Sequence, residues 1–428
     1  MKLLISGGRL IDPRTNLDQA GDILVVDGLI AQVGGKIPVN GARKLDASGL
    51  TVAPGLVDLH THLREPGRED EETVASGTRA AAAGGFTTVT AMANTDPPAD
   101  NASVIRYLRE KAGAEGAVRV EALGAITKGL AGKELAPLAE LAGAGARGFS
   151  DDGRGVARSD VMRRAFEYAR LWDLPLILHC EDADLSSGGQ MNEGYWSTFL
   201  GLAGMPAAAE EIMIERDLRL AERYGGKVHI THVSTAESVE LIRSAKERGV
   251  AVTCDVTPHH VTLSEETVAG YDTNFKMNPP LRRREDVDAL RRGLADGTID
   301  AVATDHAPHA VQEKEREFGL APFGVVGLET ALGVCLTELV PEVLSLGELL
   351  SRLSLHPSEI LGLGRGALEP GKPGDVLVFD PDASWTVDPG LFRSLSRNTA
   401  FSGRSLRGKV IHTVVGGRAI VEEGEIRC

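Results

Sequence analysis

Histidines and aspartates follow short apolar segments at several widely separated points of this 428-residue chain. Their imidazole nitrogens and carboxylate oxygens are ligands that suit Zn²⁺ or a similar divalent ion. The set comprises His60, His62, one of Asp151 and Asp152, His179, His232 and Asp305. Four histidines and two aspartates exceed the needs of one tetrahedral ion. They suit two ions that share a bridging carboxylate and a bridging hydroxide.

The elements that must position these residues are visible in the middle of the chain. Continuously apolar segments there alternate with helical stretches at 159–172, 207–224 and 235–249, a pattern typical of parallel strands covered on both faces. The expected strands are Gly55–His60, Phe86–Met92, Val118–Gly124, Ala146–Ser150, Pro175–Cys180, Lys227–Val233, Val250–Val256 and Asp300–Asp305. Eight such alternations predict an α/β fold of the (β/α)8 TIM-barrel type.

The histidines and aspartates fall at the carboxyl ends of five of these strands. Active sites of TIM barrels lie at that end, so the side chains should meet in one mouth. His60 and His62 are two residues apart and therefore point to the same side of an extended strand, where both can hold one ion. Spacing alone leaves the choice between Asp151 and Asp152 open.

The two ends of the chain have a different pattern of expected secondary structure. Residues 1–54 and 369–428 contain short strands and tight turns, including a hairpin signal at Asp27-Gly28. Neither end is long enough to bury a core alone. We therefore expect both ends to form one small β-sandwich beside a barrel domain at 55–368.

Composition narrows the classes of protein further. The chain is 42% hydrophobic and 25% charged, which excludes a disordered chain, and its net charge of −15 disfavours binding to nucleic acid. No apolar run reaches the roughly 18 residues of a membrane span, and the start MKLLISGGRLIDP lacks a secretory apolar stretch, so we expect a cytoplasmic protein. The four cysteines lie far apart without a CxxC pair, which disfavours disulfides and cysteine zinc sites.

A His-x-His pair alone is weak support for a metal site, because the chain contains several other histidines for which we expect no metal. We expect packing or surface roles for His229, His259, His260, His306, His356 and His412. His259 and His260 lie just beyond the seventh strand, where they could also support the ligands. Only the shared position of the six ligand residues at strand ends favours a metal centre.

Seven segments together give the chain a family resemblance. They are GLVDLHTHLREPG (55–67), MANTDPP (92–98), GFSDDG (148–153), LHCED (178–182), ITHVST (230–235), KMNPPLR (276–282) and TDHAPH (304–309). In content and order they resemble the dihydroorotases of the amidohydrolase superfamily, over essentially the whole chain. Single motifs are shared with hydantoinases and allantoinases, whereas HTHLREPG with MANTDPP and KMNPPLR is more specific.

The resemblance implies a particular set of metal ligands. His60, His62, Asp152 and Asp305 would hold the first zinc ion, and Asp152, His179 and His232 the second. Many members of the superfamily bridge two metals with a carboxylated lysine on the fourth strand, but ARGFSDDG (146–153) contains no lysine. An aspartate would take its place, as in the long-chain bacterial dihydroorotases, with the second zinc less firmly implied.

The resemblance also implies an activity, the reversible cyclisation of N-carbamoyl-L-aspartate to L-dihydroorotate in pyrimidine (UMP) biosynthesis. A metal-bridging hydroxide would be the nucleophile, and Asp305 would shuttle the proton unless it serves only as a ligand. Arg64 would clamp the substrate carboxylate, unless it forms a surface ion pair with Glu65 or Glu69. The implied substrate contacts are His62, Arg64, Asn94, Asn278, His309, Phe323 and Gly324. The segment 309–324 reads equally as a mobile lid or a polar loop.

Two alternatives stay open at this stage. One is another cyclic amidohydrolase, such as a hydantoinase, dihydropyrimidinase or allantoinase. The other is a non-catalytic scaffold for aspartate transcarbamoylase, although such a protein should have lost metal ligands. The expected partner is a small-molecule substrate, with a homo-oligomer and a complex with aspartate transcarbamoylase left open, and neither nucleic acid nor membrane expected.

Overall fold

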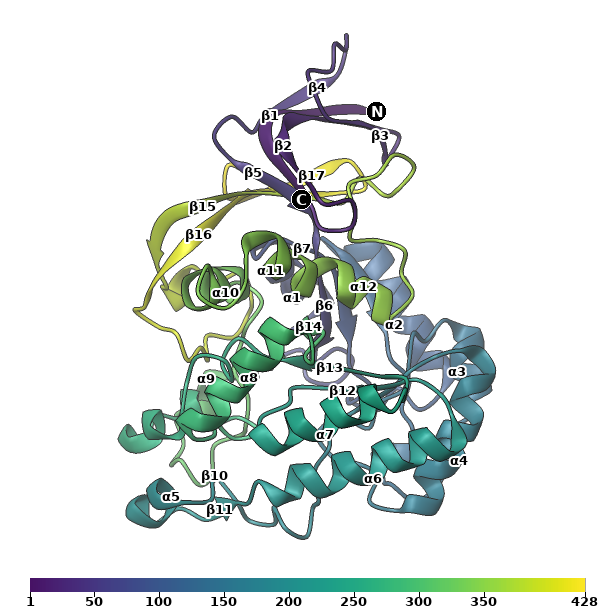
Figure 1. The fold of residues 1–428 in the computed structure, drawn as a ribbon, viewed down its shortest axis with the longest axis vertical. Helices are drawn as coiled ribbons and strands as arrows, with labels where there is room; N and C mark the ends of the chain where they lie inside the picture. The colour runs from purple at the N-terminus through teal and green to yellow at the C-terminus, as the bar shows by residue number, and fades with distance from the viewer. Residues whose placement is uncertain (428) are drawn as a thin grey trace.

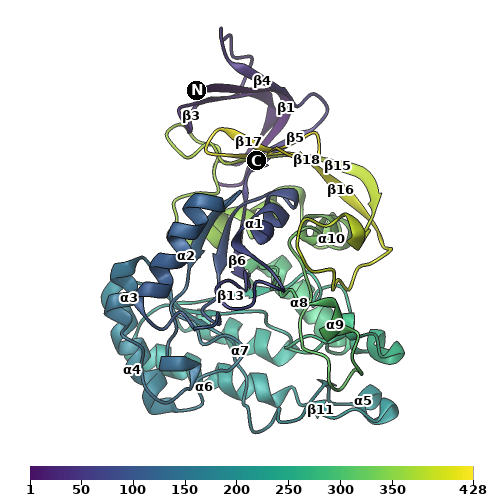
Figure 2. The ribbon, with the colours of Figure 1, turned by 180° about the vertical axis from the view of Figure 1, so that it is seen from behind.

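A computed structural model of the protein, which describes residues 1–427, shows a barrel with a second sheet at one end (Figure 1 and Figure 2). The barrel strands pair in parallel, in the orders β6-β7-β8 and β14-β13-β12-β9. They are β6 (Leu56–Thr61), β7 (Phe86–Ala91), β8 (Arg119–Ala122), β9 (Leu176–Leu178), β12 (Val228–Ile230), β13 (Val252–Val256) and β14 (Ala301–Val302). Each lies within or beside an expected strand.

The fourth expected strand, Ala146–Ser150, is only partly formed. Phe149 makes isolated parallel bridges to Gly124 after β8 and to Leu176 in β9, so the segment still fills the gap between these strands. Regular pairing ends there because the chain turns into Asp151, whose carboxylate accepts backbone N–H groups from the loop after β8. A parallel bridge from Thr61 to His306 closes the ring. The predicted (β/α)8 barrel is confirmed, with this one reduced strand.

Helices cover the outside of the barrel. The predicted helices at 159–172, 207–224 and 235–249 correspond to α4, α6 and α7. The longer helices are α1 (Val74–Ala83), α2 (Ala102–Glu115), α3 (Leu138–Ala144), α4 (Ser159–Ala169), α6 (Ala208–Tyr224), α7 (Ala236–Glu247), α8 (Arg284–Asp296) and α10 (Ala331–Leu339). The short ones are α5 (Tyr195–Leu200), α9 (Val311–Lys314), α11 (Leu346–Leu350) and α12 (His356–Ile360).

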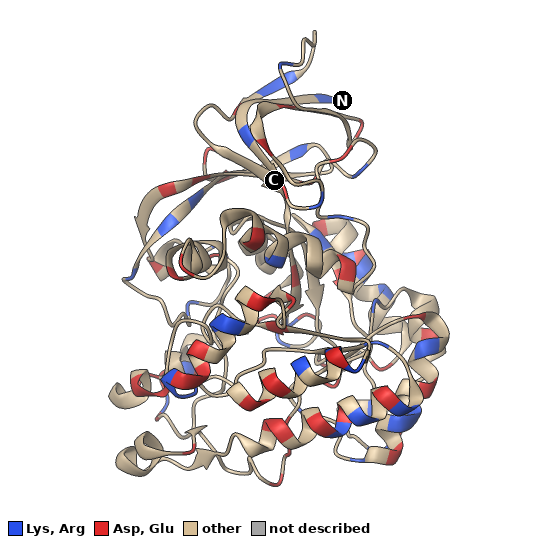
Figure 3. Ribbon diagram, in the orientation of Figure 1, with Lys and Arg blue, Asp and Glu red and all other residues tan. Residues whose placement is uncertain are grey.

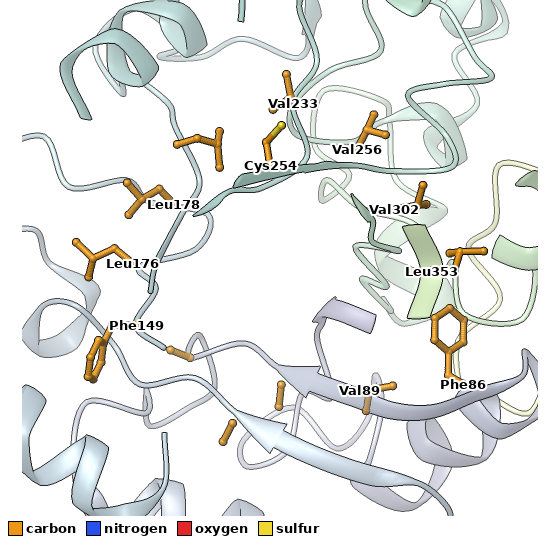
Figure 4. Packing of buried hydrophobic residues seen from close by; sticks show 14 of the residues in the cluster. Phe86, Val89, Phe149, Leu176, Leu178, Val233, Cys254, Val256, Val302 and Leu353 are labelled. Atoms are coloured by element: carbon orange, nitrogen blue, oxygen red, sulfur yellow. The ribbon is translucent and has the colours of Figure 1, made fainter. Parts of the chain in front are cut away.

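Apolar side chains line both faces of the barrel strands. Leu176 and Leu178 belong to the large cluster between strands and helices, part of which Figure 4 shows around the ring of strands. Ile177, between them, belongs to a separate inner cluster with Ala301 and Ala303. Because side chains alternate along a strand, the same phase carries His179 and Asp305 to the inside of the barrel.

Both ends of the chain build the second sheet. β5 (Thr51–Pro54), from the N-terminal part, pairs antiparallel with β15 (Val376–Thr386), and the sheet has nine strands. The others are β1 (Lys2–Asp12), β2 (Leu17–Val26), β3 (Leu29–Val33), β4 (Arg43–Asp46), β16 (Ser405–Val415), β17 (Arg418–Glu422) and β18 (Glu425–Ile426). It encloses an apolar core drawn from both ends, including Ile5, Ile23 and Val376. The predicted β-sandwich formed by both ends is thus confirmed as part of the fold.

Charged side chains lie along the outer helices, and three cysteines lie inside the protein. Basic and acidic side chains intermingle along the outer helices α4, α6, α7 and α8 (Figure 3). Within residues 1–427, no helix combines the length and apolarity needed to span a membrane. Cys180, Cys254 and Cys335 are buried free thiols, and Cys428 lies outside the described residues. A further small sheet, β10 (Met191–Asn192) with β11 (Gly204–Met205), lies near α5.

Candidate metal centre

The histidines and aspartates predicted at the strand ends come together inside the barrel, and all are buried. His60 Nε2 lies 3.4 Å from Asp152 Oδ1 and 3.4 Å from Asp305 Oδ1. His62 Nε2 lies 3.2 Å from Asp305 Oδ1 and 3.5 Å from Asp152 Oδ2. One ligand atom from each of His60, His62 and Asp305 lies within 4.8 Å of the other two, which is close enough to surround one ion.

The other side of Asp152 faces the fifth and sixth strands. Its Oδ1 lies 3.7 Å from His232 Nε2 and 3.8 Å from His179 Nδ1, and these two nitrogens are 3.0 Å apart. A second compact group unites His60, Asp152 and His232 within 4.8 Å, without His179. Asp152 therefore lies between both histidine pairs, where a bridging carboxylate would have to be.

The unsatisfied atoms of this cluster fit a metal ion. Among residues 1–427, both ring nitrogens of His60 and Nδ1 of His232 are buried without a hydrogen-bond partner, which costs free energy unless something binds them. Burial opposes the charge on His60, but Asp152 and Asp305 outweigh it and raise its pKa to about 9. Burial likewise opposes the charge on Asp305, but His60 and His62 hold its pKa below the usual value. Ionised carboxylates facing unpartnered imidazoles favour a divalent cation.

The structure shows which of Asp151 and Asp152 faces the histidines, a choice that the sequence spacing left open. Asp151 Oδ1 accepts the backbone N–H groups of Ile126 at 2.8 Å and Thr127 at 3.0 Å, and Oδ2 accepts the Thr127 hydroxyl. These bonds hold Asp151 against the loop after β8. Only Asp152 faces the histidines.

Polar groups behind the cluster orient the imidazoles. Asn94 Oδ1 lies 3.0 Å from His62 Nδ1, so this nitrogen is the donor and Nε2 is left for the centre. The Asn94 amide also donates to Asp152 Oδ2 at 3.2 Å. Glu181 Oε2 lies 2.7 Å from His179 Nε2, which turns Nδ1 toward Asp152. Glu181 was not among the expected site residues, although it stands two positions after His179 in LHCED.

The backbone is strained at three of these positions. Arg64, His232 and Asp305 have φ of +58°, +39° and +46°, a left-handed conformation that non-glycine residues rarely adopt. Such strain costs about 1–3 kcal/mol per residue and clusters at functional sites. The left-handed conformation at these residues turns the chain just beyond the ends of the strands.

Of the other histidines, His229 has the packing surroundings that we expect of it. His229 is buried between Thr253 Oγ1 and Asp255 Oδ2, at 2.8 and 2.9 Å. Asp255 also accepts the backbone N–H of His232 at 2.7 Å, so this pair supports the sixth strand end. The remaining five, His259, His260, His306, His356 and His412, lie outside the two compact groups.

Arg64 and His309 lie together beside the metal cluster. Arg64 is 15% exposed and pairs with Glu71, at 3.1 Å, rather than with the expected alternatives Glu65 or Glu69. Its Nη2 lies 3.4 Å from His309 Nε2. The structure thus brings two cationic or cation-forming side chains to one wall of the mouth.

The remaining residues that we expect to contact the substrate form hydrogen bonds with other parts of the protein. Asn278 donates to Glu181 Oε2 at 2.6 Å, and the Phe323 carbonyl accepts from His309 Nε2 at 2.7 Å. Gly324 has φ of +123°, and its carbonyl accepts from Lys314 Nζ at 3.0 Å. The segment 309–324 contains α9 and an internal hydrogen bond from Lys314 to the Gly324 carbonyl.

A buried cluster of histidines and aspartates at the carboxyl ends of (β/α)8 strands, beside a sandwich built by both chain ends, gives the fold and the candidate metal site of an amidohydrolase. Residues 49–238 match the family described as dihydro-orotase-like. The chain is 54% identical to the dihydroorotase of Pelotomaculum thermopropionicum, over 100% of both chains. It is 50% identical to that of Ruminiclostridium cellulolyticum, over 99% of both chains.

Solved structures agree with this result at the level of the fold. The L-hydantoinase (dihydropyrimidinase) from Arthrobacter aurescens superposes with a TM-score of 0.90 at 27% identity, over 100% of this chain and 97% of that one. The dihydropyrimidinase from Brevibacillus agri NCHU1002 gives 0.87 at 22% identity, over 100% and 96%. The chain belongs to the dihydroorotase family.

Proposed function

We propose that this protein is a dihydroorotase, which interconverts N-carbamoyl-L-aspartate and L-dihydroorotate in pyrimidine (UMP) biosynthesis. The observation that carries the proposal is the cluster of four imidazoles around Asp152 and Asp305, with Arg64 and His309 on the same mouth. Family membership along the whole chain supports the same reaction. The catalytic unit would be the barrel at 55–368, with 1–54 and 369–428 forming the sandwich.

The proposed cofactor is a pair of zinc ions. His60, His62, Asp152 and Asp305 would hold one, and Asp152, His179 and His232 the other. Such ions, when bound, polarise an amide carbonyl and lower the pKa of water from 15.7 to about 7. Oxygen from Asp152 is available on both sides, since its Oδ1 faces His60 and His232 and its Oδ2 faces His62.

Asp305 would move the proton. In the ring-opening direction water adds to the ring amide carbonyl, and the carbon–nitrogen bond breaks. Asp305 would accept the proton of the attacking water and deliver it to the leaving nitrogen, with the reverse order in cyclisation. Neighbouring histidines lower the pKa of Asp305, so it is ionised and able to accept. A carboxylate that served only as a ligand would leave this proton without a carrier.

The remaining residues would bind and orient the substrate. Arg64, Asn94 and His309 would receive the ring carboxylate, because a guanidinium can donate two parallel hydrogen bonds to it. Asn278 and the backbone at Phe323–Gly324 would contact the ring, and His62 would border it from the metal side. Uncharged rings such as hydantoin lack the group that Arg64 and His309 would bind.

The test compares four substrates and measures metal. Purified protein should open dihydroorotate faster than dihydrouracil, hydantoin or allantoin, and elemental analysis should find about two zinc ions per chain. Faster turnover of any uncharged ring would favour the hydantoinase alternative, which the fold similarity alone would allow. No turnover at all would favour a scaffold role. Co-elution with aspartate transcarbamoylase and the mass in solution would test the proposed cytoplasmic complex or homo-oligomer.

A further inference from the structure

Two adjacent glutamates in the loop between β6 and α1 are buried, and the proposed reaction uses neither. Glu72 turns toward His306, whose Nε2 is 3.3 Å from its Oε2, and toward the hydroxyl groups of Ser76 and Ser394. Glu71 turns the other way, into the wall formed by Arg64 and His309. Its side chain is 1% exposed, so its charge needs compensation inside the protein.

Glu71 contacts two nitrogen-bearing side chains, Arg64 and His309, that follow different strands. Its Oε2 lies 3.1 Å from Arg64 Nε, and its Oε1 lies 2.9 Å from His309 Nδ1. Arg64 follows β6, whereas His309 follows β14. One carboxylate therefore fixes the relative position of two side chains whose strands meet only where the barrel closes. Arg68 Nη2 adds a third donor, 2.9 Å from Oε1.

The surroundings of His309 depend on this carboxylate. Glu71 Oε1 faces Nδ1, and the Phe323 carbonyl faces Nε2 at 2.7 Å. Burial and then Arg64 lower the pKa of His309, whereas a neutral ring could donate to only one of the two acceptors. The Glu71 carboxylate and the Phe323 carbonyl thus hold the His309 ring at its two nitrogens, with Nε2 3.4 Å from Arg64 Nη2.

The same contacts determine which edge of Arg64 is free. Its Nε donates to the Pro308 carbonyl at 3.1 Å and faces Glu71, so the protein occupies the inner edge. In the described part of the chain, neither Nη nitrogen donates to an oxygen. The outer edge, with the N–H groups that suit a carboxylate, is left for a ligand.

We propose that Glu71 is a positioning residue that holds Arg64 and His309 as one receptor for the substrate carboxylate. This inference rests on the proposed function. Glu71 acts through its two partners and touches no reacting atom. It would therefore govern the affinity for carboxylated substrate and leave the chemical step nearly unaltered.

The experiment measures KM and kcat for dihydroorotate in wild type, Glu71→Gln, Arg64→Ala and the double variant, all of them loaded with zinc. An amide keeps the shape but can accept from only one partner while its NH₂ group opposes the other. Loss of a charged hydrogen bond predicts about a tenfold or larger rise in KM, with kcat within about threefold. In the Arg64→Ala background the same substitution should raise KM by a smaller factor, because only the contact between Glu71 and His309 is then left to lose.

Glu65→Gln is the matched control. Glu65 lies in the same loop and is buried, but it accepts from the Val74 N–H and the Tyr107 hydroxyl instead. Its substitution should lower the melting temperature and leave KM unchanged. An unchanged KM in Glu71→Gln, or an equal rise in both Arg64 backgrounds, would refute the inference. A wild-type protein that does not turn over dihydroorotate would refute the proposed function, and this inference with it.

Discussion

Removal of the Arg64 side chain is the most direct test of how this protein would recognise a charged ring. Arg64 is largely buried, is held at Nε by Glu71 and the Pro308 carbonyl, and presents its Nη groups outward. In Arg64→Ala, Glu71 keeps Arg68 and His309 as partners, so the wall should survive. The lost interaction is then the one with the substrate. A charge-assisted hydrogen bond contributes about 1.5–3 kcal/mol, which corresponds to a rise in KM of roughly 10- to 150-fold.

The assay is the initial rate of dihydroorotate opening over a range of substrate concentrations, in protein of equal zinc content. Arg365→Ala is the matched control, because Arg365 is 17% exposed and pairs with Glu121 and Thr88 on β8 and β7. It should leave KM unaltered. A wild-type KM in Arg64→Ala would show that the substrate carboxylate binds elsewhere and would refute the reasoning.

Three further results are expected. Asp305→Ala should reduce turnover at least about 10²-fold with the fold retained by circular dichroism, and a near wild-type rate with zinc bound would rule out proton transfer by Asp305. A strong chelator should abolish activity and lower the melting temperature, with both restored by added zinc, since a ligand that binds only the folded state stabilises it. Burial raises the pKa of Glu329 to about 7, so its ionisation should destabilise the fold as pH rises from about 4.5 to about 7. Denaturant unfolding at several pH values gives the free energy of unfolding as a function of pH. Glu329→Gln should remove the part of this pH dependence that Glu329 causes, and the same pH dependence in both proteins would contradict the prediction.

The ligand cluster could be predicted because it follows from strand geometry. His179 continues the inward phase of Ile177, and Asp305 that of Ala301 and Ala303, so periodicity and the barrel rule are sufficient to bring them together. The choice of Asp152 over Asp151 required the structure, because it depends on N–H groups of a different loop.

The role of Glu71 beside the site could not be predicted from the sequence. Glu71 stands in the run REDEE, where nothing in the residue types shows which acid turns inward. Only the closure of the barrel, which brings the loop after β14 beside the loop after β6, gives Glu71 its contact with His309. The fourth strand was predicted at Ala146–Ser150, but its reduction to isolated bridges was not, since the hydrogen bonds of Asp151 to the preceding loop end it rather than its own composition.

The pairing of β5 with β15 has a consequence for biosynthesis on the ribosome. Val52 in β5 is opposite Val378 in β15, so this edge of the early strand stays unpaired until the whole barrel, residues 55–368, has been translated. An exposed strand edge is a template for wrong association. The nascent chain should therefore be most prone to aggregate during this interval, and the arrival of the last strands ends it.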